Sequence, residues 1–437
     1  MANVKRLFLT ILLGYLVAGA LYARYTPAWQ TPDEPAHYNY IRQVVETGCC
    51  PRIEAGDWSS EYLGRLTSSR FAPELLGELD SVQYEDHHPP LYYLLASLVY
   101  RFSEGELITL RLFSVLLGAG VAVLSYLVCR RVLPNQPQIA LAAMALVAFL
   151  PQHLHMMSAV NNDALAELLV GLVLLWLLRY MESDALPIWQ LGLLIGLAFL
   201  TKLTIYFLAL IVPLAIWLKW RRSGEPTSEL LRSLGTFALV AGIIGGVWWL
   251  RNISAYGFPD FLGLAAHDHA VADQPRTADY IAEHGIQTFL IDLASTTYGS
   301  FWGQFGWMAL PLDSVLGGWI YRGFGLLLLG GLSGALLASR RGEIALTSWV
   351  LLLVTILIAL LQFGYYNIEF RQWQGRYLFP ALIPLAFLLV YGFDHWFERL
   401  LTRYSWRRWL APLVMMGLFA LDIYLLFRVI VPGLSPG

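Results

Sequence analysis

The chain has 437 residues, of which 57% are hydrophobic and only 14% are charged, whereas a typical soluble domain has about 25% charged residues. This composition excludes an ordinary soluble enzyme and indicates an integral membrane protein. The net charge of −2, without a long basic run, gives no sign of a nucleic-acid partner.

The apolar segments, taken in chain order, predict the number of membrane spans. The first run, 5–23, follows two basic residues like a signal peptide, but we expect it to stay as an uncleaved first helix because many spans follow. Runs close to the roughly 20 residues that a span needs follow at 107–131, 137–154, 163–181, 187–201, 203–220, 232–250, 316–339, 344–364, 377–397 and 408–430. The sequence therefore predicts an all-α integral membrane protein with about eleven transmembrane helices in one domain, 1–437.

The charges of the short loops test this arrangement. At about fourteen residues, 89–102 is short for a span, so it reads better as an interfacial or re-entrant helix. The alternate loops then carry Lys5, Arg6, Arg130, Arg131, Arg179, Lys219, Arg221, Arg222, Arg340, Arg341, Arg399, Arg403, Arg407 and Arg408. The positive-inside rule makes these loops cytoplasmic, whereas counting 89–102 as a span would reverse every later loop. The extracytoplasmic segments are then 24–106, 251–315 and 364–376, and the first, long loop carries interfacial helices.

The polar residues of unusual position all fall on the predicted outer side. They are Asp33, Glu34, His37, Glu85, Asp86, His87, His88, His155, Asn161, Asn162, Asp163, Lys202, Arg251, His267, Asp268, His269, Arg371, Gln374 and Arg376. Ionisable groups at membrane depth are costly and normally pair, face a cavity or serve a function. This one-sided distribution predicts a single polar site that opens outward.

Each of these groups also has an ordinary structural explanation. Acids in an outer loop are usually solvated, although the prolines of "PDEP" hold Asp33 and Glu34 on a rigid backbone. Asp86 and Asp163 would each suit a helix N-terminus. Lys202 needs an anion at its outer turn, and so do Arg251 and Arg376; a phosphate headgroup would serve, and the alternative is ordinary snorkelling of the cations.

A metal site and the redox state of the cysteines stay open at this stage. His267 and His269 could bind a divalent metal with Asp33 or Asp86, but only if their segment is extended, and no zinc-type spacing is present. Cys49, Cys50 and Cys129 do not form a disulfide framework, and we expect unpaired thiols.

Several motifs together resemble one enzyme superfamily. They are "PDEPAHY", "HHPPLYYLL", "LRLFSVLLGAGVAVLSYLVCRR", "SAVNNDALAE", "LAFLTKLT" and "QGRYLFP". The pattern resembles the C-type (GT-C) membrane glycosyltransferases, in particular bacterial relatives of protein O-mannosyltransferases and of the aminoarabinose transferases that modify lipid A. The resemblance covers most of the chain.

The resemblance implies a polyprenyl-phosphate sugar donor and an active site at the outer face of the cell inner or plasma membrane. Asp33 matches the first catalytic acid and becomes the candidate general base, while Asp86 aligns with a second acid. Cations must stabilise the departing phosphate; the candidates are Lys202, Arg251, Arg371 and Arg376. Further candidate substrate contacts are Glu34, His37, His87, His88, Asn162, Asp163 and Tyr377.

The expected reaction is a single displacement that inverts the anomeric centre and passes the sugar to a protein, a lipid or a glycan. Arginines could replace a divalent metal, which stays a possible cofactor. The non-enzymatic alternative is a flippase or exporter of lipid-linked sugars, but a transporter should place its charges along a path through the bilayer. A polysaccharide ligase or polymerase, which would use a lipid diphosphate, is the third possibility.

Overall fold

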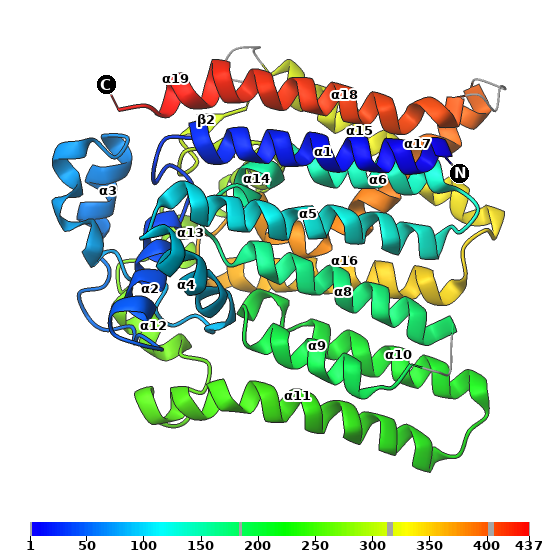
Figure 1. Ribbon diagram of the computed structural model, residues 1–437, viewed down its shortest axis with the longest axis horizontal. Helices are drawn as coiled ribbons and strands as arrows, with labels where there is room; N and C mark the ends of the chain where they lie inside the picture. Colours follow the sequence, from blue (N-terminus) through cyan, green and yellow to red (C-terminus); the bar gives the residue numbers. More distant parts are fainter. Residues whose placement is uncertain (1, 183–185, 313–317, 401–405, 437) are drawn as a thin grey trace.

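Long helices form the body of the molecule and lie side by side (Figure 1). The computed structural model describes residues 2–182, 186–312, 318–400 and 406–436. The long helices are α1 (Ala2–Tyr25), α5 (Leu107–Val132), α8 (Asp163–Glu182), α10 (Leu208–Ser223), α11 (Thr227–Tyr256), α15 (Trp319–Ala338), α16 (Leu346–Glu369), α17 (Leu382–Leu400) and α18 (Arg407–Leu425). Several are extended by η2 (Leu203–Ile205), η3 (Ser339–Arg341), η4 (Gly375–Ala381), the π-helical turn Leu426–Ile430 and α19 (Val431–Leu434). The predicted helical fold is confirmed.

Among the described residues, fewer helices than the expected eleven are long and apolar enough to count as spans. Within the described ranges, nine helices are long and apolar enough to cross a membrane, and there are ten if α6 (Pro137–Phe149) and α7 (Pro151–Met157) count as one span bent by 64°. The remaining predicted segment contains α9 (Trp189–Phe199), whose 11 residues rise only about 16 Å. A hydrocarbon core is about 30 Å thick, so α9 is too short to count by length alone.

Helix α9 nevertheless returns the chain to the end of the molecule where α8 begins. Lys202, just after α9, places its Nζ atom 2.6 Å from Oδ1 of Asp163, the first residue of α8. The close packing of α9 on α11 needs a residue without a side chain, because a Cβ atom on Gly196 would lie 2.6 Å from Cβ of Ile244. The polypeptide therefore runs out along α8 and back along α9.

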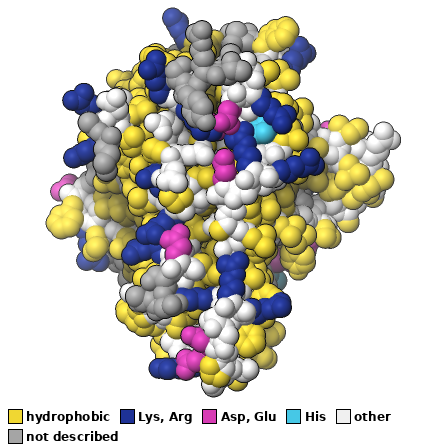
Figure 2. All heavy atoms as spheres, turned by 90° about the vertical axis from the view of Figure 1, so that its right-hand side faces the viewer, with side chains coloured by type: hydrophobic (Ala, Val, Ile, Leu, Met, Phe, Trp, Pro, Cys, Tyr) yellow, Lys and Arg dark blue, Asp and Glu magenta, His cyan; other side chains and the backbone are white. Residues whose placement is uncertain are grey.

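The two ends of the bundle differ in charge. One end, called here the basic end, holds the last turns of α5, α10 and α17 together with η3, which carry Arg130, Arg131, Arg221, Arg222, Arg399, Arg340 and Arg341. Figure 2 looks at this end and shows Lys and Arg side chains spread over it among fewer acids. The opposite end, called here the site end, holds the short helices and connecting loops (Figure 1).

The site end is built from short elements between the long helices. They are α2 (Glu34–Glu46), α3 (Ser60–Ser68), η1 (Pro73–Ser81), α4 (Leu91–Ser103), α12 (Leu264–Ala270), α13 (Thr277–His284), α14 (Ile286–Trp302), and the two-residue strands β1 (Gln304–Phe305) and β2 (Leu310–Pro311), which pair antiparallel. Helix α4 covers the segment 89–102 and packs against α2 at this end (Figure 1). It does not run the length of the bundle, as expected for an interfacial helix.

The first and second outer loops share a small hydrophobic core, which the sequence analysis did not anticipate. Tyr62, Leu66 and Phe71 of the first loop pack in one buried cluster with Val271 of the second, and Trp307 packs against it. Together the two loops form a cap on the site end. Burial of this apolar surface holds the loop residues near the site in fixed positions.

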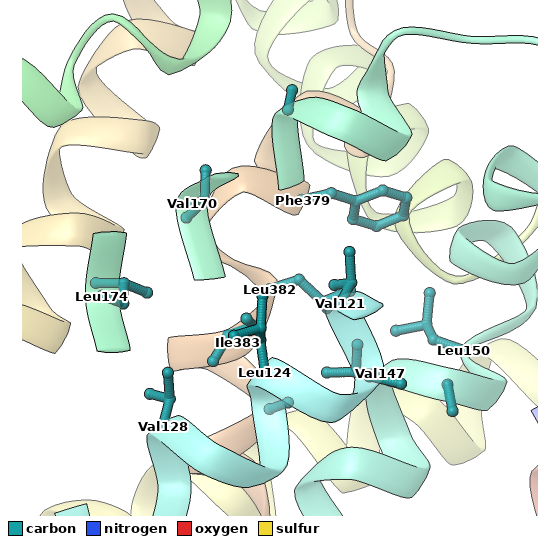
Figure 3. Close-up of a cluster of buried hydrophobic side chains, with 14 of the residues drawn as sticks. Val121, Leu124, Val128, Val147, Leu150, Val170, Leu174, Phe379, Leu382 and Ile383 are labelled. Atoms are coloured by element: carbon teal, nitrogen blue, oxygen red, sulfur yellow. The ribbon is translucent and has the colours of Figure 1, made fainter. Parts of the chain in front are cut away.

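The main core lies where η4 and α17 meet α5, α6 and α8. Figure 3 shows Val121 and Leu124 of α5 packed with Val170 of α8 and with Phe379 and Ile383 of the η4–α17 segment. The backbone of α17 crosses α15 so closely that a Cβ atom on Gly392 would lie 1.7 Å from the carbonyl oxygen of Gly331. This packing fixes α17 and, with it, the residues of η4 that enter the site.

Residues 313–317, assigned to the end of the second outer loop and the start of the next span, lie outside the described residues, as does Arg403. The expectation of unpaired thiols is wrong for Cys49 and Cys50, whose sulfur atoms form a disulfide between adjacent residues. Cys129 is a free, buried thiol.

Candidate active site

Asp33 lies at the N-terminus of α2 with a backbone conformation that leaves its carboxylate free for other partners. Its φ of 69° is in the left-handed region, which Asp and Asn adopt more readily than most residues. Pro35 follows in the first turn, where proline fits without loss of a helix hydrogen bond. The Asp33 side chain makes no capping bond to its own helix. It instead accepts a hydrogen bond of 2.8 Å from the Tyr84 hydroxyl and forms an ion pair with Arg376.

Arg376 enters the site from η4, at the start of the segment that leads into α17. Its guanidinium is only 5% exposed, pairs with Asp33 through Nη2, and lies 5.3 Å from the ring centre of Tyr377. Its buried Nε atom has no hydrogen-bond partner among the described residues. The preceding Gly375 donates its N–H to Ser300 of α14 at 2.7 Å, which anchors the turn. Arg376 therefore uses Nη2 for the ion pair with Asp33, whereas its Nε donor is not used by any described residue.

A second ion pair joins the starts of α8 and η2. Lys202 donates to Asp163 at 2.6 Å, and the Asp163 backbone N–H donates to Oδ1 of Asn161 at 2.8 Å. Asn162 is fully buried and donates to the Tyr93 hydroxyl at 3.2 Å. The expected cap by Asn162 or Asp163 is not formed, because the Asp163 carboxylate pairs with Lys202 and the first backbone N–H of α8 is bound by Asn161 instead. The "NND" turn also presents polar side chains to the site.

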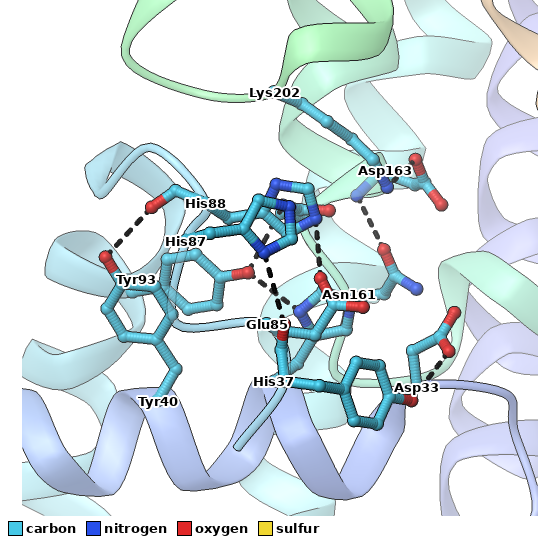
Figure 4. Close-up of polar contacts among 12 residues, drawn as sticks. Asp33, His37, Tyr40, Glu85, His87, His88, Tyr93, Asn161, Asp163 and Lys202 are labelled. Carbon is cyan, nitrogen blue, oxygen red and sulfur yellow. Dashed lines mark hydrogen bonds and ion pairs between the residues drawn. The ribbon is translucent and has the colours of Figure 1, made fainter. Parts of the chain in front are cut away.

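Imidazoles and a carboxylate complete this cluster. His88 Nε2 lies 2.5 Å from Glu85, and His37 stacks on His88 while its Nδ1 lies 2.8 Å from the Tyr93 hydroxyl. Burial is the main cause that lowers the pKa of His37 to about 4, so its imidazole is neutral at pH 7. Figure 4 shows these side chains converging on the region of Asp33, Asp163 and Lys202 from separate segments of the chain.

Asp86 and its neighbour Glu85 have different partners, and Glu85 is the one that pairs with His88 of this cluster. The Asp86 side chain is fully buried and accepts a 2.7 Å hydrogen bond from Gln43 of α2. Burial raises the pKa of Asp86 to about 8, and the charged groups acting on it include Asp57, its neighbour Glu85 and Arg251. Successive side chains of the turn before α4 point in different directions, so one residue of offset separates the two acids.

Glu34 points away from Asp33 into the protein interior. It is fully buried and forms a two-pronged ion pair with Arg111 of α5, at 2.7 Å from Nε and 2.6 Å from Nη2. It also accepts the backbone N–H groups of Trp29 and Val160. The predicted substrate-binding role of Glu34 has no support in this geometry, because all of these contacts are internal.

The other predicted cations are distributed over the site end. Arg251 donates to the backbone carbonyl groups of Cys50 and Pro51 and stacks on Trp248. Arg371 is exposed and stacks on the rings of Tyr280 and Trp373. The structure therefore brings only Lys202 and Arg376 into the cluster around Asp33.

The predicted metal candidates do not come together. The segment "HDH" is helical in α12, so His267, which packs against His87, and His269, which is exposed, point in different directions. Burial is the main cause that lowers the pKa of His87 well below its usual value. Within the described ranges, no group of three or more His, Cys, Asp or Glu side chains is arranged to hold a metal ion.

Several buried polar atoms around the cluster have no hydrogen-bond partner in the part of the chain that the structure describes. They are Nδ1 of His88, Nδ2 of Asn161, Oδ1 of Asn162, Nδ1 of His155 and Nε of Arg376. Buried polar groups are paired in the great majority of cases. Such a group of unpaired donors and acceptors at one place is typical of a site that binds a polar ligand.

Sequence reasoning missed some residues of this arrangement. Tyr84 and Tyr93, which bind Asp33 and His37, carry no signal beyond their place beside the polar motifs. Arg111 did carry a signal, because a cation inside an apolar helix needs a partner. Glu85 was among the polar residues on the predicted outer side, but the resemblance assigned the second acid to its neighbour Asp86.

Comparison with known proteins agrees with the motif pattern. Residues 87–248 match a family model described as Dolichyl-phosphate-mannose-protein mannosyltransferase, which confirms the resemblance to membrane glycosyltransferases. The matched region contains "HHPPLYYLL", the "NND" turn and Lys202. The acids Asp33, Glu85 and Asp86 lie outside it, as does Arg376. No curated protein sequence matches the chain significantly.

Solved structures show a similar fold. ArnT from Cupriavidus metallidurans bound to undecaprenyl phosphate has a TM-score of 0.56 at 17% identity, with 98% of this chain and 73% of that chain covered. The apo state of the same protein has a TM-score of 0.55 at 15% identity, with the same coverage. These likenesses establish a shared membrane fold over almost the whole chain.

Proposed function

We propose that this chain is an inverting glycosyltransferase that moves a sugar from a polyprenyl-phosphate donor to an acceptor on the extracytoplasmic face of the membrane. Its membrane glycosyltransferase fold and the family match over 87–248 support this class. The observation that carries the proposal is the Asp33–Arg376 ion pair, set beside the Lys202–Asp163 pair among buried polar atoms without partners. The arrangement offers one carboxylate, two cations and unfilled hydrogen-bonding positions at one end of a membrane bundle.

In the proposed reaction Asp33 accepts the proton of the acceptor hydroxyl or amine. The acceptor atom forms a bond to the anomeric carbon, and the bond from that carbon to the phosphate oxygen breaks. The polyprenyl phosphate leaves with the electron pair, and Lys202 and Arg376 stabilise the charge that develops on it. Attack from the face opposite the phosphate inverts the anomeric centre.

The ion pair of Asp33 with Arg376 suggests how the donor prepares the site. Without a phosphate, the base and the cation neutralise each other. A phosphate offers the guanidinium a stronger, two-pronged partner and would draw it from the carboxylate. Donor binding would then leave Asp33 free to accept a proton.

The sidedness of the membrane follows from the positive-inside rule and is part of the proposal. The basic end would face the cytoplasm, and the site end would face outward. Helix α9 brings the chain back to the end where Asp163 lies, which favours eleven crossings. In this arrangement α9 is a short crossing that packs against α8 and α11. A flippase is less well supported, because the ion pairs with Asp33 and Lys202 gather at one end rather than along a path.

The test is the Asp33→Asn variant assayed for sugar transfer from a defined polyprenyl-phosphate donor. Asn keeps the size of the side chain and tolerates the left-handed backbone, so the loss of the proton acceptor should lower the rate about 10²–10⁴-fold. Donor binding should persist. The matched control is Asp80→Asn, an exposed acid in the same outer loop, 4.0 Å from Arg42. Transfer by Asp33→Asn at the wild-type rate would remove the proposed role of Asp33.

A further inference from the structure

The two oxygen atoms of the Asp33 carboxylate have different partners. Tyr84, which is buried in the cap, donates its hydroxyl proton to Oδ1 at 2.8 Å. Arg376 forms its ion pair with the other oxygen, Oδ2. The Asp33 side chain is 21% exposed, which leaves part of it open to a substrate. The candidate base is therefore held at one oxygen by a neutral hydroxyl and at the other by a cation.

The Tyr84 side chain is fixed by contacts of its ring and of its backbone. The ring belongs to the buried core of the cap and lies edge-on to Trp58, with 5.0 Å between the ring centres. Trp58 in turn donates its indole N–H to Asp273 of the second outer loop. The Tyr84 carbonyl oxygen lies 3.1 Å from Nδ1 of His87. Both loops of the cap therefore contribute to the position of the hydroxyl beside Asp33.

The Tyr84 hydroxyl acts as a hydrogen-bond donor and not as a second base. Burial is the main cause that raises the pKa of Tyr84 well above its usual value, and the negative charge of Asp33 raises it further. The phenol therefore keeps its proton at neutral pH. Because this hydrogen bond does not involve Arg376, it persists when the ion pair on the other oxygen is broken.

We propose that Tyr84 is a positioning residue, which holds Oδ1 of Asp33 so that Oδ2 receives the proton of the acceptor. This inference rests on the proposed function, in which Asp33 is the base. When a donor phosphate draws Arg376 away, Oδ2 loses its partner, whereas Oδ1 keeps the Tyr84 hydroxyl. The proton moves from the acceptor oxygen or nitrogen to Oδ2, the acceptor atom bonds to the anomeric carbon, and the phosphate leaves with the electron pair of the broken bond. A carboxylate fixed at one oxygen keeps its orientation toward the acceptor, which lowers the entropic cost of reaching the transition state.

The test compares Tyr84→Phe with the wild-type protein in sugar transfer from a defined polyprenyl-phosphate donor. Phe keeps the ring that packs in the cap and removes only the hydroxyl. Loss of one hydrogen bond to a charged group should lower kcat about 10–100-fold, whereas the KM for the donor should stay close to the wild-type value. In an Asp33→Asn background, Tyr84→Phe should lower the rate no further, because the group through which Tyr84 acts is already absent.

The chain offers a matched control in the same buried core. Tyr62 is 7% exposed, as Tyr84 is, and it donates its hydroxyl to the backbone carbonyl of Leu75 at 2.6 Å. Tyr62→Phe therefore removes a comparable hydroxyl from the cap without touching Asp33. The two Phe variants should have similar melting temperatures, but Tyr62→Phe should transfer sugar at the wild-type rate.

The outcomes separate the inference from the proposed function. Transfer by Tyr84→Phe at the wild-type rate would overturn the positioning role. A loss of rate that persists in full in the Asp33→Asn background would show that the hydroxyl acts independently of Asp33, and an equal loss in Tyr62→Phe would assign the effect to the cap as a whole; either would overturn the inference. A wild-type rate for Asp33→Asn alone removes the proposed base itself, whereas failure of the Tyr84 test with an impaired Asp33→Asn leaves that base in place.

Discussion

Neighbouring acids at the site end differ in what surrounds them. Asp33 faces Arg376 and Tyr84, whereas Glu34, next to it, faces inward to Arg111. The same divergence separates Glu85, paired with His88, from Asp86, which is fully buried beside Gln43. Because consecutive side chains leave a turn in different directions, each pair of adjacent acids contributes only one member to the cluster. The sequence alone would have placed both acids of each pair in the cluster.

Asp86→Asn should change the pH dependence of stability more than it changes activity. Burial raises the pKa of Asp86 from 3.8 to about 8, so the folded protein holds a proton that the unfolded chain has lost above pH 4. The stability due to this group is therefore complete below about pH 4 and is lost as the pH rises to 8. Asn mimics the neutral acid and removes this loss.

The measurement is the melting temperature of both proteins between pH 5 and pH 9. The variant should become more stable than the wild type as the pH rises, and its transfer rate at pH 7 should stay within a few-fold of the wild-type rate. Asp80→Asn controls for the loss of an exposed acid. A constant difference in melting temperature across the range would contradict a neutral, buried Asp86.

At the scale of elements, the position of Asp33 depends on how α2 is attached to α5. Arg111 of α5 holds Glu34 by two hydrogen bonds and also donates to the carbonyl groups of Ala23, Thr26 and Pro27. One guanidinium therefore ties together the end of α1, the start of α2 and α5. This contact explains how the turn that presents Asp33 keeps its place beneath the cap formed by the outer loops.

Glu34→Gln should therefore be destabilising. Removing one partner of a buried ion pair typically costs about 3–5 kcal/mol because it leaves the other charge uncompensated. The melting temperature in detergent should fall clearly. Glu46→Gln provides the control on the same helix, since its contact with Arg42 is 3.9 Å long and exposed and such pairs contribute only about 0–1 kcal/mol.

A double replacement distinguishes the ion pair from a general packing defect. Glu34→Gln combined with Arg111→Met removes both charges and should recover part of the lost melting temperature. Losses that simply add in the double variant would show that the two side chains stabilise the protein independently.

At the scale of the whole molecule, the proposed orientation can be tested by accessibility. Ser59 precedes α3 at the site end, and Ser223 is the last residue of α10 at the basic end. In a background with Cys49, Cys50 and Cys129 replaced by Ala, single cysteines at these positions should react with a membrane-impermeant thiol reagent from opposite sides. Labelling of both in intact cells would contradict the threading.

The sequence could predict the helical bundle because both of its signals are local. A membrane span needs one long apolar run, and the loops on one side of the membrane are enriched in Lys and Arg. It also predicted the gathering of Asp33, His37, Asp163, Lys202 and Arg376 at one end. It could not predict which neighbours face the cluster, as Arg251 and Asp86 show, because that depends on the path of a few loop residues. The cap was missed for a related reason: its core is shared by two loops about 200 residues apart, so the partner of each loop cannot be read from the loop itself.

The ion pair between Asp33 and Arg376 has a consequence for the order of events in the proposed reaction. While Arg376 occupies the carboxylate, an acceptor that arrives first finds no competent base. The lipid donor would therefore have to bind before the acceptor, and the lipid phosphate product would leave last. In steady-state terms the enzyme would follow a compulsory order, and in the donor-free state the carboxylate would be shielded from misdirected proton transfer.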